Sequence, residues 1–86
     1  CSHSGICNFT GHARNVTGES RVADIIGGMH VLGCHEPDME GIIGYFKSAG
    51  VRRLHPCHCT DLAAKAALSR AFPVEECGSG TRLEFN

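Results

Sequence analysis

The chain has 86 residues and a formal net charge of −1 at neutral pH. This balanced charge offers no electrostatic attraction to nucleic acid or to anionic lipid, so we expect no nucleic acid and no membrane among its partners. Its apolar runs are far shorter than the roughly 20 residues that cross a bilayer, and no export signal is apparent, which predicts a soluble, cytoplasmic chain of one domain at most.

The first predicted elements are a helix and a short strand. A helix over residues 5–17 is supported by apolar residues at helical spacing and by Gly18, which follows them as a natural stop. These apolar residues are Ile6, Phe9, Ala13 and Val16. A β-branched run over residues 22–26 then predicts a buried strand, which ends at the glycine pair 27–28 and delivers His30 to its carboxyl end.

The middle of the chain predicts a loop followed by the clearest helix. Residues 29–37 have no clear period, so we interpret them as a loop over the strand ends, where functional residues often lie. Acidic residues at Asp38 and Glu40 favour the start of a second helix there, and Gly50 ends it. Its apolar stripe consists of Met39, Ile42, Ile43, Phe46 and Ala49.

The last third predicts a strand, a helix and two closing strands. Residues 51–55 form the strand, which Pro56 stops because proline has no N–H to donate to a ladder. Thr60 is the predicted N-cap of an alanine-rich helix over residues 61–71. Residues 74–76 and 81–85 are predicted strands around a Gly-Ser-Gly turn. The order α-β-α-β-α-β-β predicts a layered α/β fold with right-handed crossovers.

Three histidines follow apolar or strand-like stretches: His3, His30 and His58. The carboxyl ends of neighbouring strands meet at one edge of an α/β sheet, so imidazoles that recur there can converge on one metal ion. The turns after His3 and His58 lead into predicted helices, where small or capping residues leave room for an ion. For any one of these histidines taken alone, a hydrogen-bonded structural role is the alternative.

Four motifs extend this pattern over nearly the whole chain. They are Cys-Ser-His-Ser-Gly-Ile at 1–6, Ile-Ile-Gly-Gly-Met-His at 25–30, Arg-Leu-His-Pro-Cys-His-Cys-Thr at 53–60 and Gly-Ser-Gly-Thr-Arg-Leu-Glu-Phe at 78–85. Together they resemble the C-terminal half of metallo-β-lactamase-fold hydrolases, in the branch similar to dihydropterin ribofuranosyl-aminobenzene phosphate synthase. The resemblance implies that residues 1–86 are a single partial domain of an αββα sandwich, whose N-terminal half this chain lacks.

The resemblance also implies an incomplete metal site. In such enzymes a His-x-His-x-Asp-His motif of the N-terminal half supplies the first ligands of a one- or two-metal centre, and this chain has no such motif. By family pattern His3 and His58 are metal ligands. His30 stands where many members carry a bridging aspartate, so it is a ligand, a substrate contact or a proton carrier.

Further expectations follow from this resemblance. The implied cofactor is a divalent metal, zinc first and iron or manganese as alternatives. The implied partners are a small-molecule substrate and either the absent N-terminal half or another copy of the chain. The chain alone is expected to lack hydrolase activity, which would be metal-hydroxide attack on an ester, amide or phosphoester.

Several polar residues are interpreted as lining or supporting the site. Cys57 and Cys59 flank His58 and, in extended geometry, point away from it, which favours packing or supporting roles over ligation. The residues predicted to line a pocket or to support the ligands are Ser4, Cys34, His35, Cys57 and Cys59. Asp24 lies within an apolar strand and needs a partner there, such as an arginine or a backbone amide.

Other readings of the cysteines and of the function stay open. Six cysteines fit a disulfide scaffold, but regular helix and strand patterns favour reduced thiols. One alternative function is a metal-binding or oligomerising fragment without hydrolase activity, because a half-sandwich leaves an apolar sheet face to be covered. Another is a structural zinc module that uses Cys1, His3, Cys57 and Cys59.

Overall fold

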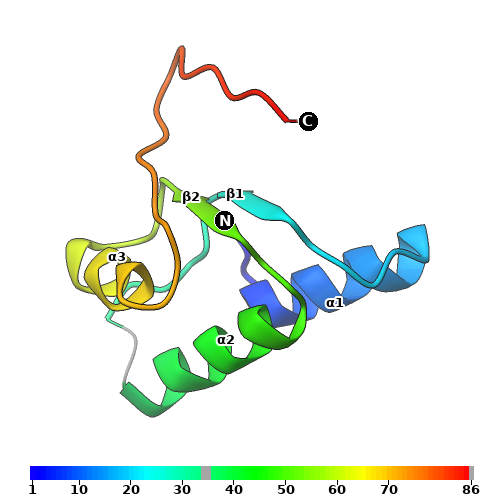
Figure 1. Cartoon of the computed structure of the whole chain (residues 1–86). Helices are drawn as coiled ribbons and strands as arrows, with labels where there is room; N and C mark the ends of the chain where they lie inside the picture. The colour runs from blue at the N-terminus through cyan, green and yellow to red at the C-terminus, as the bar shows by residue number, and fades with distance from the viewer. Residues whose placement is uncertain (34–35, 86) are drawn as a thin grey trace.

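The structure, a computed structural model, describes residues 1–33 and 36–85. Its elements are α1 (Ile6–Thr17), β1 (Asp24–Gly27), α2 (Glu36–Ser48), β2 (Arg53–Pro56) and α3 (Leu62–Ser69) (Figure 1). β1 and β2 pair in parallel, with Asp24 opposite Arg53 and Gly27 opposite Pro56. The first five predicted elements are therefore present in the predicted order, and the fold is a small α/β arrangement.

Two predicted boundaries are wrong for reasons that involve proline. Pro56 is the last residue of β2 instead of the residue after it, a position at which a missing N–H costs the ladder little. Helix α2 begins at Glu36, so residues 36–37 are helical and not part of a loop. Pro37 fits there because its fixed φ suits the first turn of a helix. Residues 34–35 of the predicted loop lie outside the described residues.

The two predicted closing strands are absent from the described part of the chain. Val74 makes only one parallel bridge, to Leu54, and it is flanked by Leu54 N–H donating to Pro73 O (3.0 Å) and Glu75 N–H donating to Leu54 O (2.9 Å). Residues 81–85 form no strand and are mostly exposed. In Figure 1 this red segment lies above the sheet and apart from it, so its backbone has no neighbouring strand to pair with.

The hydrophobic core lies where the helices cover the sheet. Phe46 of α2 and Leu54 of β2 are fully buried, and the Phe46 ring meets Phe72 edge to face at a centroid distance of 6.1 Å. The whole buried apolar cluster consists of Ile6, Met29, Val31, Met39, Phe46, Ala49, Val51, Leu54, Ala64, Leu68 and Phe72. The predicted stripe of α2 accordingly faces the core, with Ile42 and Ile43 packed against its border.

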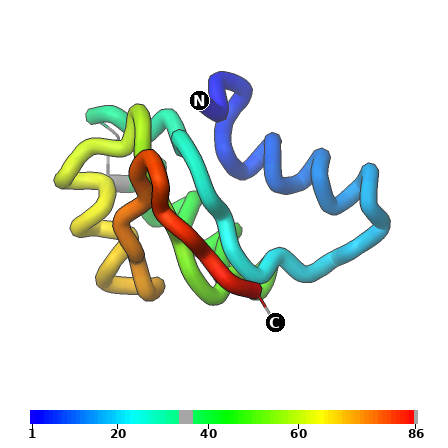
Figure 2. Tube along the Cα trace, turned by 90° about the horizontal axis from the view of Figure 1, so that it is seen from above, coloured from blue at the N-terminus to red at the C-terminus, as the bar shows by residue number. Residues whose placement is uncertain are grey.

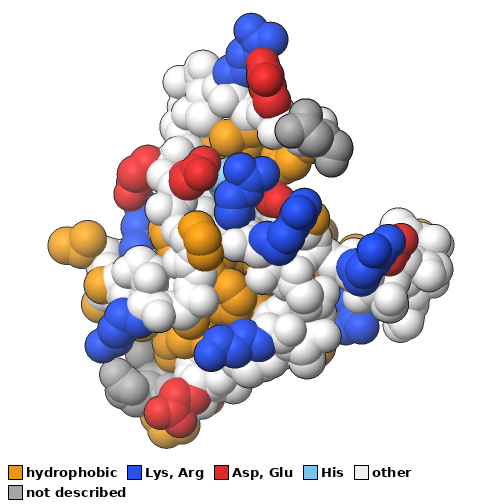
Figure 3. Space-filling model, in the orientation of Figure 1, with side chains coloured by type: hydrophobic (Ala, Val, Ile, Leu, Met, Phe, Trp, Pro, Cys, Tyr) orange, Lys and Arg blue, Asp and Glu red, His pale blue; other side chains and the backbone are white. Residues whose placement is uncertain are grey.

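Helix α1 is covered less completely than α2. It lies on the side of β1 away from α3 (Figure 2). Ile6 and Thr10 are buried, whereas Phe9 and Val16, two members of the predicted apolar face, are 60% and 70% exposed. Gly18 ends the helix, as predicted, and it adopts the left-handed conformation there. Apolar side chains also reach the surface among charged ones on the face that Figure 3 presents.

Within the described residues, no helix combines the length and apolar character that a membrane crossing requires.

Candidate metal centre

The turn that carries His3 is tied to the end of β1. The backbone N–H and the hydroxyl of Ser2 both donate to Gly28 O, at 3.2 and 3.0 Å. Gly5 N–H donates to Ser2 O at 2.9 Å and closes the turn directly before α1. Because these bonds join the N-terminal turn to the segment after β1, His3 and His30 come close although 27 positions separate them, with ring centroids 4.6 Å apart.

The segment after β1 is in turn tied to the loop after β2. Met29 N–H donates to Thr60 Oγ1 (3.3 Å), His30 N–H donates to Cys59 Sγ (3.1 Å), and Val31 N–H donates to Cys59 O (2.9 Å). Three consecutive amides are thus satisfied by two residues of the other loop. The carboxyl ends of β1 and β2 therefore carry one connected structure rather than two independent loops.

The start of α3 corrects a predicted role of Thr60. The N-cap is Asp61, whose Oδ1 accepts a hydrogen bond from Ala64 N at 2.8 Å. The Thr60 hydroxyl instead accepts a hydrogen bond from Met29 N–H in the loop after β1. Asp61 Oδ2 also accepts from Gly33 N at 3.0 Å. The hydrogen bonds from the Gly33 and Ala64 amides favour the carboxylate and lower the pKa of Asp61.

Close backbone contact and unusual dihedral angles mark this edge of the fold. A Cβ on Gly28 would lie 2.8 Å from His58 O and 2.9 Å from Cys59 Sγ, so glycine is what lets the two loops meet. His30 and Cys59 have φ of 55° and 54°, in the left-handed region that residues other than glycine rarely adopt. Such conformations persist only where the surrounding structure holds them in place, and they cluster at functional sites.

Five side chains of the three segments form two sets of metal-ligating atoms. One set consists of Cys1, His3 and His30, and the other of Cys1, His58 and Cys59. Within each set all ligand atoms lie within 4.8 Å of one another. The structure therefore brings His3 and His30 together and places His58 in a second set, and the Cys1 thiol joins the two.

The donor chemistry of both sets fits a divalent metal ion of the zinc type. Tetrahedral zinc with bonds of about 2.0 to 2.3 Å holds its ligand atoms roughly 3.5 Å apart, so small side-chain rotations would complete either set. Imidazole nitrogen and thiolate sulfur are preferred zinc ligands, whereas magnesium and manganese favour oxygen. The three histidines are exposed, which leaves room for further ligands.

Comparison with known proteins gives two sequence relatives and one solved structure, while no protein-family model matches the chain. An uncharacterized protein of Methanocaldococcus jannaschii, MJ0448, is 34% identical over 70 residues, which cover 81% of this chain and 26% of the relative. From the same organism, 7,8-dihydropterin-6-methyl-4-(β-D-ribofuranosyl)-aminobenzene-5′-phosphate synthase is 28% identical over 87 residues, covering 99% of this chain and 30% of the relative.

The solved structure decides the fold comparison. It is the crystal structure of Tm1679, a metal-dependent hydrolase of the β-lactamase superfamily, and it matches with a TM-score of 0.87 and 33% identity. The chain resembles one part of a β-lactamase-superfamily hydrolase. The match covers 99% of this chain and 34% of the hydrolase. The chain thus spans about a quarter to a third of the length of the proteins it matches.

The other residues predicted to line or support the site lie in different places. Ser4 is exposed and its carbonyl accepts from Asn8 Nδ2 at 2.7 Å. Cys57 is half-buried and belongs to neither ligand set. Cys34 and His35 lie outside the described residues. The described cysteines are free thiols.

The expectation that Cys59 points away from His58 is wrong. It assumed an extended backbone, but the left-handed φ of Cys59 turns its sulfur to within 4.8 Å of a His58 ring nitrogen. Cys1, absent from the predicted site, belongs to both ligand sets. The Cys1-Ser2-His3 spacing was its only sequence signal. The four residues of the structural zinc alternative do not form one set, because Cys57 lies outside both.

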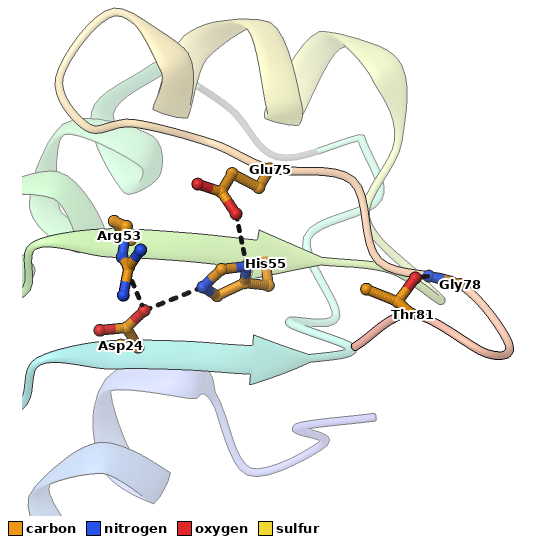
Figure 4. A network of polar contacts seen from close by, with 6 residues as sticks. All are labelled: Asp24, Arg53, His55, Glu75, Gly78 and Thr81. Atoms are coloured by element: carbon orange, nitrogen blue, oxygen red, sulfur yellow. Dashed lines mark hydrogen bonds and ion pairs between the residues drawn. The ribbon is translucent and has the colours of Figure 1, made fainter. Parts of the chain in front are cut away.

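A second polar group lies within the sheet itself (Figure 4). Asp24 Oδ2 accepts from Arg53 Nε at 3.0 Å and contacts His55 Nε2 at 2.9 Å, and the side chains of Asp24 and His55 are 4% and 1% exposed. The His55 hydrogen bond, supported by the Arg53 charge, lowers the pKa of Asp24 although burial opposes the shift. The predicted arginine partner of Asp24 is thereby confirmed, and the second partner is His55.

Proposed function

We propose that this chain supplies part of the metal centre of a metal-dependent hydrolase of the β-lactamase superfamily. The observation that carries the proposal is the pair of cysteine and histidine ligand sets beyond the carboxyl ends of β1 and β2. It gains support from the likeness of the fold to a metal-dependent hydrolase. The substrate class would be a small-molecule ester, amide or phosphoester.

The residues of this chain would hold and orient the metal. His3 and His30 would bind from the turns before α1 and after β1, and His58 would bind from the loop after β2. Their backbone hydrogen bonds fix the three turns, so the imidazoles need little reorganisation to bind. A bound divalent ion, zinc first among candidates, would lower the pKa of a bound water and polarise the scissile bond.

The chain would act together with residues outside it. Two ligand sets of three side chains each leave coordination positions open, and the matched proteins are about three times as long as this chain. A His-x-His-x-Asp-His motif elsewhere in the full protein would provide the remaining ligands. We therefore expect the chain by itself to bind metal and to show no hydrolysis.

The experiment is a comparison of metal binding by matched histidine variants. The purified chain is loaded with zinc, dialysed and analysed by plasma mass spectrometry, alongside His3→Ala, His58→Ala and the control His12→Ala. His12 is an exposed residue of α1 and belongs to neither ligand set. We expect the first two variants to retain much less zinc than the wild type and the control to retain as much, because only the first two variants remove a ligand.

Two results would contradict the proposal. Equal zinc content in all four proteins would contradict the proposal that His3 and His58 bind the metal. If zinc binds as expected but a protein that joins this chain to a His-x-His-x-Asp-His segment hydrolyses no ester, amide or phosphoester, the chain is a metal-binding fragment without hydrolase function. Reading the coding sequence upstream of Cys1 for that motif decides which joined protein to prepare.

A further inference from the structure

We propose that Cys1 and Cys59 bind the metal ion directly as thiolates, together with His58. This inference rests on the proposed function for the location of the metal and adds that the centre contains sulfur ligands. The ligand atoms of these three residues lie within 4.8 Å of one another. Two thiolates and one imidazole leave a fourth tetrahedral position open, as catalytic zinc sites do.

The backbone of Cys59 is what allows two adjacent residues to bind one ion. In an extended chain successive side chains point to opposite sides, so His58 and Cys59 would diverge. The φ of 54° at Cys59 is not that of an extended chain, and the sulfur lies within 4.8 Å of a His58 ring nitrogen. A left-handed conformation is costly for cysteine, and a metal bond is a gain that would offset the cost.

The surroundings of the Cys59 sulfur fit a thiolate ligand. His30 N–H donates to this sulfur at 3.1 Å. Hydrogen bonds from backbone amides stabilise the negative charge of a thiolate and orient it toward a metal. Gly28 lies beside the sulfur, and a Cβ there would approach it to 2.9 Å. These two neighbours therefore hold the Cys59 sulfur beside the other ligand atoms rather than in the apolar core.

Cys1 completes the set from the N-terminal turn. The hydrogen bonds of Ser2 to Gly28 O hold this turn beside the segment after β1, and the bonds of Met29 and His30 to Thr60 and Cys59 join that segment to the loop after β2. Cys1 is exposed, so its sulfur is accessible to an incoming ion. Because Cys1 Sγ also belongs to the set of His3 and His30, one thiolate is in reach of both metal positions. Thiolate ligation favours zinc, cobalt or cadmium over magnesium, calcium and manganese.

A disulfide between Cys1 and Cys59 is the competing use of the same two sulfurs. A disulfide requires an S–S distance of about 2.05 Å and would remove both sulfurs from the metal. The experiment is therefore done in the presence of a phosphine reductant. Thiol titration with and without the reductant shows how many of the cysteines are oxidised.

The experiment is a titration of the reduced 86-residue chain with cobalt(II), followed by near-ultraviolet absorption. A sulfur-to-cobalt charge-transfer band that saturates with added metal is the expected result. The band should fall by about half in Cys59→Ser and in Cys1→Ser, be lost when both substitutions are combined, and be unchanged in Cys57→Ser. Cys57 is the matched control because it is half-buried like Cys59, lies two positions away and belongs to neither ligand set.

A cobalt-loaded chain without this band would overturn the inference, as would a band of undiminished intensity in Cys59→Ser or one that survives in the double variant. If the serine variants fail to fold, X-ray absorption of the zinc-loaded wild-type chain replaces them. It should show a zinc–sulfur shell at about 2.3 Å, and a shell of nitrogen and oxygen alone would contradict the inference.

The two proposals fail in different ways. If metal binding depends on His3 and His58 but shows no sulfur ligation, only the proposal of sulfur ligands is contradicted. A sulfur band that is unchanged in His3→Ala and His30→Ala supports the thiolate site, and if the zinc content is also unchanged in these variants, only the histidine ligands of the proposed function are contradicted.

Discussion

The histidines of this protein lie in two different environments on the same pair of strands. His55, within β2, is 1% exposed, and its Nε2 lies 2.9 Å from a carboxylate oxygen of Asp24. His3, His30 and His58 lie beyond the strand ends, are exposed, and have imidazoles and thiols as neighbours. A buried carboxylate partner makes a histidine part of the fold, whereas an exposed cluster of soft ligand atoms makes it available to a metal.

The largest expected effect is on the buried group. Asp24→Ala should lower the free energy of unfolding by about 3 kcal/mol, because His55 and Arg53 lose their common acceptor inside the sheet. Zinc binding by the native fraction should not change. Urea unfolding measures the first quantity and metal analysis the second, with Glu19→Ala as the control, since the Glu19 ion pair with Arg21 is exposed. A large loss of zinc affinity without a loss of stability would reverse the two roles.

A glycine substitution tests whether the exposed cluster depends on the close contact of its loops. In Gly28→Ala the new Cβ would meet His58 O and Cys59 Sγ at less than 3.0 Å, so we expect about 2 kcal/mol of destabilisation and weaker zinc binding. Gly44→Ala is the matched control. It lies in α2 with open space around it and should stabilise the chain by about 0.5 kcal/mol. Wild-type zinc affinity in Gly28→Ala would show that the loop contact does not shape the cluster.

The pH dependence of stability gives a smaller effect. The pKa of Asp24 is lowered in the folded state, so its stabilisation is complete above the unfolded value of about 3.9 and is lost as the pH falls through the folded value. Unfolding free energies measured from pH 6 down to pH 2 should therefore decline less steeply in Asp24→Asn than in the wild type. The pKa values of Asp61 and Glu19 are also lowered, but these residues are present in both proteins. Parallel profiles would show that Asp24 does not titrate with folding.

Local pattern was sufficient to predict the helices and the two paired strands. The α2 stripe repeats at helical spacing and faces the core as expected, because a long amphipathic helix leaves one way to bury its apolar residues. The prediction of two closing strands was wrong because a strand requires a hydrogen-bonding partner as well as a suitable sequence pattern. Residues 81–85 have no neighbouring strand within the described structure.

The candidate site was predictable in outline only. Strand ends and motif likeness indicated His3, His30 and His58, and the structure groups them around Cys1. The position of the Cys59 sulfur beside His58 could not be predicted, because alternation along an extended chain fails at a left-handed φ. The sequence also could not show that Asp61 and not Thr60 is the N-cap of α3. Both residue types are good N-caps, and only the contact of the Thr60 hydroxyl with Met29 N–H distinguishes their roles.

The most direct test of the account is a nuclear magnetic resonance titration of the histidine side chains with zinc. The imidazole signals of His3, His30 and His58 should shift together as zinc is added. Those of His55, held within the sheet by Asp24, and of His12, on the surface of α1, should stay in place. Shifts centred on His55 or His12, or no shifts at all, would contradict the claim that the exposed cluster is the metal centre.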